Sequence, residues 1–232
     1  SPAKSRPGRL SGAEGGPGHQ HERFVGRNVL FEYATVFGMR FRGGREGLPV
    51  VEGAIAGAVA WIAGYALTAL VVLARMSETQ LGEISEGTGG GSGIDFVGWV
   101  FFNSHFVDVV VEADVLGLGG SRAVSFIGSD GFTPLLYLVP VALLIGAGLA
   151  VGRSLGVTRT VDGVIAGVLV VPAYLVLSAI GAVLFRVSTA ALGASFSGQP
   201  ELLPALLLAG VVFPAVFGAI GGAVAANTTG GR

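Results

Sequence analysis

The sequence contains no cysteine, only one lysine and few charged residues of either sign. The absence of cysteine excludes disulfides, thiolate metal sites and thiol nucleophiles. Charged residues make up 12% of the chain, about half the fraction that is usual in soluble proteins. A soluble fold of 232 residues could not cover its surface with so few charges. We therefore expect lipid to replace water over much of that surface.

The sequence also lacks the motifs of several functional classes. It has no Gly-x-x-x-x-Gly-Lys-Ser/Thr loop, which excludes the ATP-driven mechanism that depends on such a loop. The formal net charge of −1 provides no global field that would attract nucleic acid. We find no catalytic, cofactor-binding or metal-binding motif. The sequence therefore predicts a protein that is not an enzyme, has no cofactor and does not bind nucleic acid.

Four long uncharged stretches dominate what is present. They cover residues 53–74, 132–152, 163–185 and 202–226. Each reaches the roughly 20 residues that a helix needs to cross the hydrocarbon core of a bilayer. They predict an all-α integral membrane protein, with spans at about 50–74, 132–152, 162–185 and 202–226.

The positions of arginine and lysine predict how these spans are oriented. Eleven of the 14 cationic residues lie in the N-terminal segment, in the loop between the second and third spans, or at the C-terminus. Only Arg75, Arg122 and Arg186 lie on the other side. Because cytoplasmic loops are enriched in Arg and Lys, we predict a multi-pass protein of the plasma membrane with both termini in the cytoplasm.

The chain divides into a polar tail and a membrane domain. Residues 1–46 are rich in Gly, Ser, Pro and charge, which is typical of a disordered or interfacial tail. Residues 47–232 form the membrane domain, in which residues 75–131 are the longest loop, placed outside by the predicted orientation. Within that loop, residues 94–111 carry aromatic residues at helical spacing. We expect an interfacial or re-entrant helix there.

The two halves of the membrane domain are similar in sequence. Residues 51–57 read VEGAIAG, and residues 161–167 read VDGVIAG. The second and fourth spans also align when Pro140 is placed on Pro214. We interpret the domain as a duplicated two-helix hairpin, in which both copies enter the membrane from the cytoplasm.

Each span also contains a Gly-x-x-x-Gly motif. The glycines are Gly53, Gly57, Gly148, Gly152, Gly163, Gly167, Gly218 and Gly222. Small residues let helices approach closely, and all eight lie in the cytoplasmic halves of the predicted spans. We therefore expect the helices to be close together near the cytoplasm and to diverge outward, around an outward-facing cavity or a lipid-filled cleft.

The predicted outer helix would place three metal-capable side chains on one stripe. His105, Asp108 and Glu112 fall at positions i, i+3 and i+7. Histidine and carboxylates suit divalent metals and proton transfer. The same spacing is also typical of a solvated face of an amphipathic helix, which we favour. Alternatively, Asn103 and His105 would hydrogen-bond the outer ends of the spans.

Two further pairs of charged residues are candidates for a polar site. Glu52 and Asp162 begin the first and third spans, where a carboxylate accepts free backbone N–H groups and complements the helix dipole. The alternative is a two-carboxylate proton or cation site, because ionisable groups at membrane depth are often functional. On the outer side, Arg122 and Arg186 would pair with the acidic loop or attract an anion.

Four segments carry a resemblance to a known family. They begin at residues 48, 97, 135 and 212 and read LPVVEGAIAGAVAWIAGY, VGWVFFNSHFV, LLYLVPVALL and VFPAVFGAIGGAVA. Over roughly residues 48–226 the chain resembles an uncharacterised family of haloarchaeal multi-pass membrane proteins, sometimes labelled only "transporter". The resemblance implies a four-span archaeal membrane protein and supplies no catalytic residue.

Two functions remain open. The first, which we favour, is a structural, accessory or scaffold-type subunit, in the lipid bilayer alone or in a larger membrane complex. The alternative is a small transporter or channel, which would need a homo-oligomer with the glycine faces as interfaces. Polar residues that could line a pathway are sparse, namely Tyr65, Thr68, Tyr174 and Ser178. Their sparsity counts against ion translocation.

Overall fold

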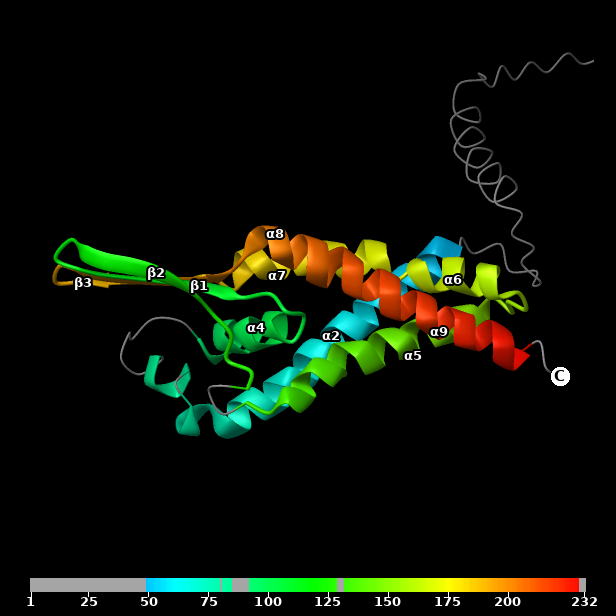
Figure 1. The fold of residues 1–232 in the computed structure, drawn as a ribbon, viewed down its shortest axis with the longest axis horizontal. Helices are drawn as coiled ribbons and strands as arrows, with labels where there is room; N and C mark the ends of the chain where they lie inside the picture. Colours follow the sequence, from blue (N-terminus) through cyan, green and yellow to red (C-terminus); the bar gives the residue numbers. More distant parts are fainter. Residues whose placement is uncertain (1–48, 80, 85–91, 129–131, 230–232) are drawn as a thin grey trace, which may run out of the picture. The chain divides into compact units, whose positions relative to one another are not determined.

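The computed structural model describes residues 49–79, 81–84, 92–128 and 132–229 (Figure 1). All of these residues belong to one compact unit of the chain, Phe41–Arg232. The prediction of a tail at residues 1–46 lies outside the described residues. The elements below therefore concern the membrane domain alone.

Four helical spans are long and apolar enough to cross a membrane, at Pro49–Glu78, Pro134–Ser154, Thr160–Leu184 and Leu202–Thr228. The first consists of α2 (Pro49–Arg75) and a 3-10 turn (Met76–Glu78). The second is a 3-10 turn (Pro134–Tyr137) followed by α5 (Leu138–Ser154). The third joins α6 (Thr160–Val168) to α7 (Val171–Leu184). The fourth comprises α8 (Leu202–Pro204), a π-helix (Ala205–Val212) and α9 (Phe213–Thr229).

The third and fourth spans are interrupted near prolines. Pro172 has no N–H to offer the carbonyl of Val168, the residue at which α6 ends. In the fourth span, Pro214 has no N–H to offer the carbonyl of Gly210, which lies in the π-helix. The π pattern bonds the Phe213 amide to the Leu208 carbonyl, five residues back, so the missing hydrogen bond falls at Ala209 and the helix continues past the proline. Both interruptions therefore follow from the local sequence.

The predicted Gly-x-x-x-Gly residues lie where two helices meet at backbone distance. A Cβ atom added to Gly148 of α5, or to Gly167 of α6, would overlap the carbonyl oxygen of Gly218 on α9. On α2, an added Cβ at Gly57 would overlap the carbonyl oxygen of Val170, at the α6–α7 junction. These glycine faces pack within the chain, so they are not available as the oligomer interfaces that the transporter alternative would need.

A short helix fills the space between the spans at the end opposite to the glycine contacts. Helix α4 (Gly93–Asn103) contacts both α2 and α7, and Figure 1 shows it beside them. Its N-terminus is a capping box, in which Asp95 accepts hydrogen bonds from the Ser92 amide and hydroxyl at 2.7 and 2.9 Å. All residues from Phe96 to Asn103 are buried. Aromatic side chains therefore occupy the region where we expected an outward-facing cavity.

The prediction of a single helix over residues 94–111 is wrong in its second half. The helix ends at Asn103, and Phe106 adopts a positive φ of 58° that no helix can continue through. Residues from Val109 onward form a strand, where three consecutive valines favour the extended conformation. Because α4 is buried, it is also not the surface helix of the interfacial alternative.

The all-α prediction is likewise wrong, because two β-hairpins pair into one sheet. The first hairpin is β1 (Val109–Val115) with β2 (Leu118–Val124), and the second is β3 (Val187–Ala191) with β4 (Ala194–Pro200). The four strands are antiparallel in the order β2-β1-β4-β3. One hairpin connects the first span to the second, and the other connects the third to the fourth. The two loops between these spans therefore assemble into one structure.

Candidate functional site

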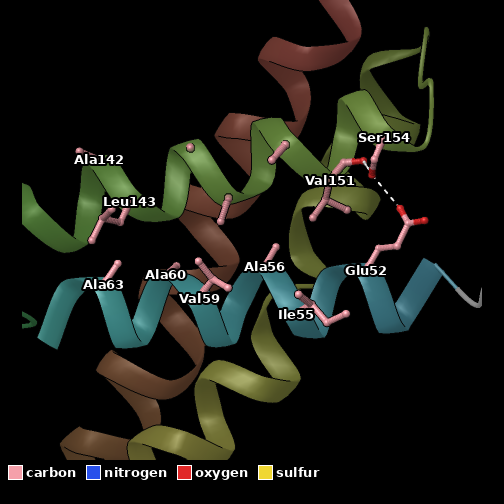
Figure 2. Close-up of a pocket in the computed structure, with 13 residues that line it drawn as sticks. Glu52, Ile55, Ala56, Val59, Ala60, Ala63, Ala142, Leu143, Val151 and Ser154 are labelled. Atoms are coloured by element: carbon pink, nitrogen blue, oxygen red, sulfur yellow. Dashed lines mark hydrogen bonds between the residues drawn. The ribbon is translucent and has the colours of Figure 1, made fainter. Parts of the chain in front are cut away.

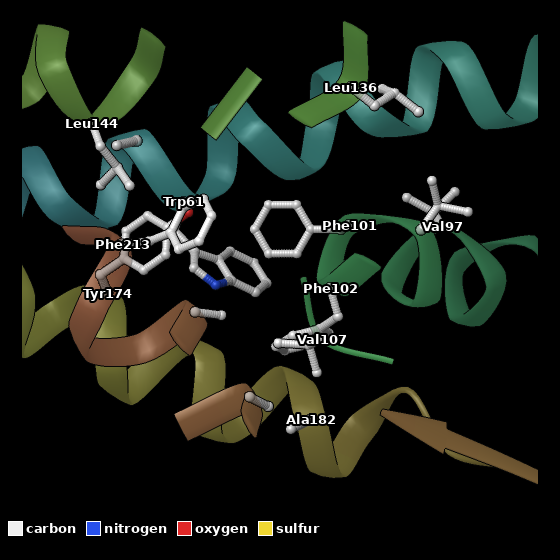
Figure 3. Close-up of a cluster of buried hydrophobic side chains, with 14 of the residues drawn as sticks. Trp61, Val97, Phe101, Phe102, Val107, Leu136, Leu144, Tyr174, Ala182 and Phe213 are labelled. Carbon is white, nitrogen blue, oxygen red and sulfur yellow. The ribbon is translucent and has the colours of Figure 1, made fainter. Parts of the chain in front are cut away.

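The most polar part of the interior lies where the C-terminal end of α4 meets α7. Asn103, Ser104 and His105 are buried there together with Tyr174 and Ser178 of α7. We call these five residues the buried polar cluster. Aromatic rings surround it, and Figure 3 shows several of them, including Trp61 of α2 and Phe213. The ring centroid of Phe101 lies 4.8 Å from that of His105 and 5.0 Å from that of Trp61.

His105 is fully buried, and both of its ring nitrogens have partners. The Nδ1 atom lies 2.8 Å from the carbonyl oxygen of Phe101, and the Nε2 atom lies 2.8 Å from the hydroxyl of Tyr174. A carbonyl oxygen can only accept, so Nδ1 carries the proton and Nε2 accepts from Tyr174. Burial lowers the pKa of His105 from 6.5 to about 4. The ring is therefore neutral near pH 7 and joins the α4 end to α7.

The polar side chains of the spans form further structural hydrogen bonds. Trp61 donates its indole N–H to the hydroxyl of Ser178 at 3.2 Å, which links α2 to α7. Tyr65 donates to the carbonyl oxygen of Ile94 at 2.8 Å, which links α2 to α4. Thr68 donates to the carbonyl oxygen of Gly64 within its own helix. Of the four residues considered for a pathway, Tyr65, Tyr174 and Ser178 therefore link separate segments of the chain, whereas Thr68 bonds only within α2.

Asn103 stabilises the chain reversal after α4. Its amide nitrogen donates to the carbonyl oxygen of Val107 at 2.8 Å, and its amide oxygen accepts from the backbone N–H of Phe126 at 2.9 Å. It thus binds the two segments that lead into β1 and out of β2. Across the part of the chain that the structure describes, every buried side-chain nitrogen or oxygen has a partner.

The predicted metal stripe does not form. His105 points into the interior, whereas Asp108 and Glu112 are exposed, because the helix that would have aligned them ends before His105. Glu112 lies in β1 and accepts a hydrogen bond from Ser197 of β4 at 3.4 Å. No group of three metal-capable side chains occurs among the residues that the structure describes. On β2 and before β3, Arg122 and Arg186 are exposed.

The two predicted carboxylates occupy the first turns of their helices. Glu52 lies in the first turn of α2, and Asp162, which is buried, lies in the first turn of α6. Glu52 accepts a hydrogen bond of 2.7 Å from the hydroxyl of Ser154, at the end of α5. Each position suits the positive end of a helix dipole. The hydrogen bond of Glu52 thus joins the start of α2 to the end of α5.

An open apolar groove runs between α2 and α5 from the Glu52–Ser154 pair (Figure 2). Its volume is about 570 Å³. Small residues from both helices line it, namely Ala56, Ala60, Ala63, Ala142, Gly146 and Ala150. We call this feature the α2/α5 groove. The small side chains of Ala and Gly at successive turns leave the space that larger residues would fill. The Gly-x-x-x-Gly motifs do not include these residues, so those motifs did not predict the groove.

Comparison with known proteins gives a family but no activity. A family model described as a family of unknown function (DUF7978) matches residues 40–229. No curated protein and no solved structure matches the chain in the same comparisons. Function must therefore be argued from the geometry of this chain.

Proposed function

We propose that this chain, which belongs to the DUF7978 family of unknown function, is a non-enzymatic structural or accessory subunit of the plasma membrane. In this role the four spans anchor a β-sheet that projects on the outer side and binds a partner protein, while both termini lie in the cytoplasm. The four apolar spans fit a membrane protein. The haloarchaeal origin and the transporter label that the resemblance implies remain predictions.

The observation that supports this role best is the apolar tip of the sheet. Val115, Leu116, Leu118 and Leu192 are exposed at the ends of the two hairpins. The amide of Leu116 bonds the carbonyl oxygen of Gly193 at 2.9 Å, which places both turns side by side. We call these four residues the sheet tip. Exposed apolar clusters of this kind commonly mark interaction sites.

The backbone of the sheet tip adds to the argument. Leu116 and Leu192 have positive φ angles of 55° and 49°. A leucine in the left-handed region costs about 1 kcal/mol or more, and Asn or Gly is usual there. Leucine, whose backbone is strained at these φ angles, thus occupies both turns. The side chains of Leu116 and Leu192 are nonetheless largely exposed and pack against little of the chain. A partner that covers the two leucines would explain their presence.

The buried polar cluster supports the same role. Its hydrogen bonds fix α4 and the start of β1 against α7, so the sheet is attached to the spans by interior contacts. A subunit that presents a surface benefits from such attachment. A translocation pathway, in contrast, would need polar groups that are free to exchange partners.

The test is to purify the full chain from its native membrane in mild detergent and to identify proteins that co-purify in stoichiometric amounts. The double variant Leu116→Asn/Leu192→Asn should lose that partner while its own unfolding temperature stays equal or rises, because Asn favours the turn conformation. Ser121→Asn, on exposed β2, is the matched control and should retain the partner. A chain that purifies without any partner, or a partner that the double variant retains, would contradict the proposal.

One observation favours the alternative of a small oligomeric transporter. The third span is interrupted between α6 and α7, and discontinuous helices at membrane depth form substrate sites in many transporters. A homogeneous oligomer without partners, together with solute flux in proteoliposomes, would support that alternative. The variant Gly57→Leu would then reduce flux, because the added side chain would collide with Val170 at the α6–α7 junction.

The duplication also remains a proposal. Both halves place a β-hairpin between two spans, which supports it, although only the first half has a further helix, α4, before its hairpin. The central strand pair, however, joins β1 to β4, which are not equivalent strands of the two halves. A duplication would therefore have diverged in how its hairpins pair.

A further inference from the structure

The α2/α5 groove has the length of one leaflet of a bilayer. Along α2 it extends from Glu52 to Ala63, and along α5 from Ser154 back to Ala142. Eleven residues of helix rise about 16 Å, which is roughly half of the 30 Å hydrocarbon core. The groove therefore begins at the headgroup level, where α2 starts, and ends near the middle of the membrane.

Beyond the groove the same face of α2 becomes bulky. Leu67 and Leu70 continue the helical stripe of Ala63 and are exposed. Within the groove, larger residues such as Ile55 and Val59 flank the small ones. A partner helix that crosses the whole membrane would therefore meet a narrow recess in one leaflet and bulky side chains in the other. An acyl chain of a single leaflet matches the groove along its full length. The dimensions thus favour a lipid over a helix as the occupant.

The mouth of the groove carries polar groups that suit a zwitterionic headgroup. The Glu52 carboxylate accepts from the Ser154 hydroxyl at 2.7 Å, and no ion pair neutralises it within the described segments. Arg153, next to Ser154 in sequence, is exposed at the same end of α5. An ammonium group could therefore pair with Glu52, and the neighbouring phosphate could approach Arg153.

We infer that the α2/α5 groove binds one phospholipid with an amine-bearing zwitterionic headgroup, from the leaflet that contains the N-terminal end of α2. The acyl chain lies along Ala56, Ala63, Gly146 and Ala150, and the ammonium group donates to Glu52. This site is distinct from the sheet tip, because the sheet lies at the opposite end of the spans from the N-terminus of α2 (Figure 1).

The test measures bound lipid on the full chain by native mass spectrometry in mild detergent. Three lipids with identical acyl chains are added separately: phosphatidylethanolamine, phosphatidylcholine and phosphatidylglycerol. We expect one retained phosphatidylethanolamine and weaker retention of the others. Its ammonium N–H groups can donate to the Glu52 carboxylate, whereas phosphatidylcholine has no N–H donor and phosphatidylglycerol offers only neutral hydroxyls on an anionic lipid. Glu52→Gln should reduce the preference for phosphatidylethanolamine over phosphatidylcholine roughly five-fold, the scale of one interfacial ion pair.

A second variant tests the groove itself. Gly146 lines the groove, and a Cβ added there meets nothing within 4 Å. Gly146→Leu should therefore fold normally and abolish retention of the bound lipid. Val176→Phe, at an exposed site on α7 outside the groove, is the matched control and should retain it.

Three outcomes would overturn the inference. Equal retention of all three lipids that Glu52→Gln does not change would indicate nonspecific lipid only. Retention by Gly146→Leu would place the lipid elsewhere. Dimers that Gly146→Leu converts to monomers would assign the groove to a second copy of the chain. Because the readout is bound lipid, each result is independent of whether the sheet tip binds a partner.

Discussion

His105 shows how a single residue can be polar, buried and yet structural. Its Nδ1–H donates to the carbonyl oxygen of Phe101, and its Nε2 accepts from the Tyr174 hydroxyl. A protonated ring would need Tyr174 to accept instead of donate, and would carry a charge in an interior lined by aromatic rings. The site is therefore built for the neutral ring.

This arrangement predicts that stability falls at acidic pH. The pKa of His105 is about 4 in the folded chain, against an ordinary value of 6.5. Between these values the unfolded chain binds the proton and the folded chain does not, so stability decreases as pH falls from about 6.5 to about 4. The full loss is on the order of 3 kcal/mol. Free energies of unfolding, measured in detergent at pH 7, 6, 5 and 4, would show it.

The comparison variant for this experiment is His105→Gln, which can form hydrogen bonds but does not titrate. Its stability at pH 7 is expected to be lower, and its decline between pH 6.5 and 4 should be shallower by the His105 contribution. If both proteins lose stability in parallel, other groups cause the decline and the neutral-histidine assignment is wrong.

At the scale of elements, the glycines of the spans determine which helices touch. Gly148 of α5 and Gly218 of α9 meet at their backbones, so any side chain at position 148 must displace the neighbouring helix. Gly146 lies two residues earlier, about half a turn away on the same helix. It faces the open groove. Two glycines of one helix therefore have opposite roles, which sequence alone does not distinguish.

We predict that Gly148→Ala destabilises the chain by about 1–3 kcal/mol, the usual cost of overpacking. Gly146→Ala, the matched control, should be neutral or stabilising by up to about 1 kcal/mol, because it removes backbone freedom from the unfolded chain. The free energy of unfolding of both variants, measured side by side in one detergent, tests this. A Gly148→Ala protein as stable as Gly146→Ala would contradict the close α5–α9 contact.

The elements also show how far sequence reasoning reaches. The four spans were predictable because each is a continuous apolar run whose length is set by the bilayer. The sheet was not, because its central pairing joins residues such as Glu112 and Ser197, which are 85 positions apart. Either hairpin alone is marginally stable, so neither gives a strong local signal. The end of α4 was missed because the apolar pattern continues into β1 although the periodicity changes.

The residues of the candidate site were predictable only in part. Asn103 and His105 attracted attention as polar residues in an apolar stretch, with the alternative that both hydrogen-bond the outer ends of the spans. His105 does bond a span residue, Tyr174 of α7, whereas Asn103 bonds Val107 and Phe126, which lie outside the spans. The metal stripe failed because it assumed helical spacing through His105, Asp108 and Glu112. The α2/α5 groove was missed because it depends on which alanines face outward once the glycines have paired.

At the scale of the whole molecule, the number of spans determines where the hairpins lie. Four spans place the loops after the first and third on one side of the membrane, so both hairpins can pair into one sheet only there. The loop between α5 and α6 lies on the opposite side. The excess of arginine in that loop and in the N-terminal segment predicts that this opposite side is the cytoplasm.

The absence of cysteine makes this orientation directly testable. Single variants Ser121→Cys on β2 and Thr158→Cys between α5 and α6 introduce one thiol each at exposed positions. In intact cells, a maleimide that cannot cross membranes should label Ser121→Cys and leave Thr158→Cys unlabelled. Both variants should react once the membrane is dissolved, which shows that each thiol is accessible. The reverse pattern would invert the topology and place the sheet tip in the cytoplasm, and labelling of both in intact cells would mean that the chain does not separate these loops across a membrane.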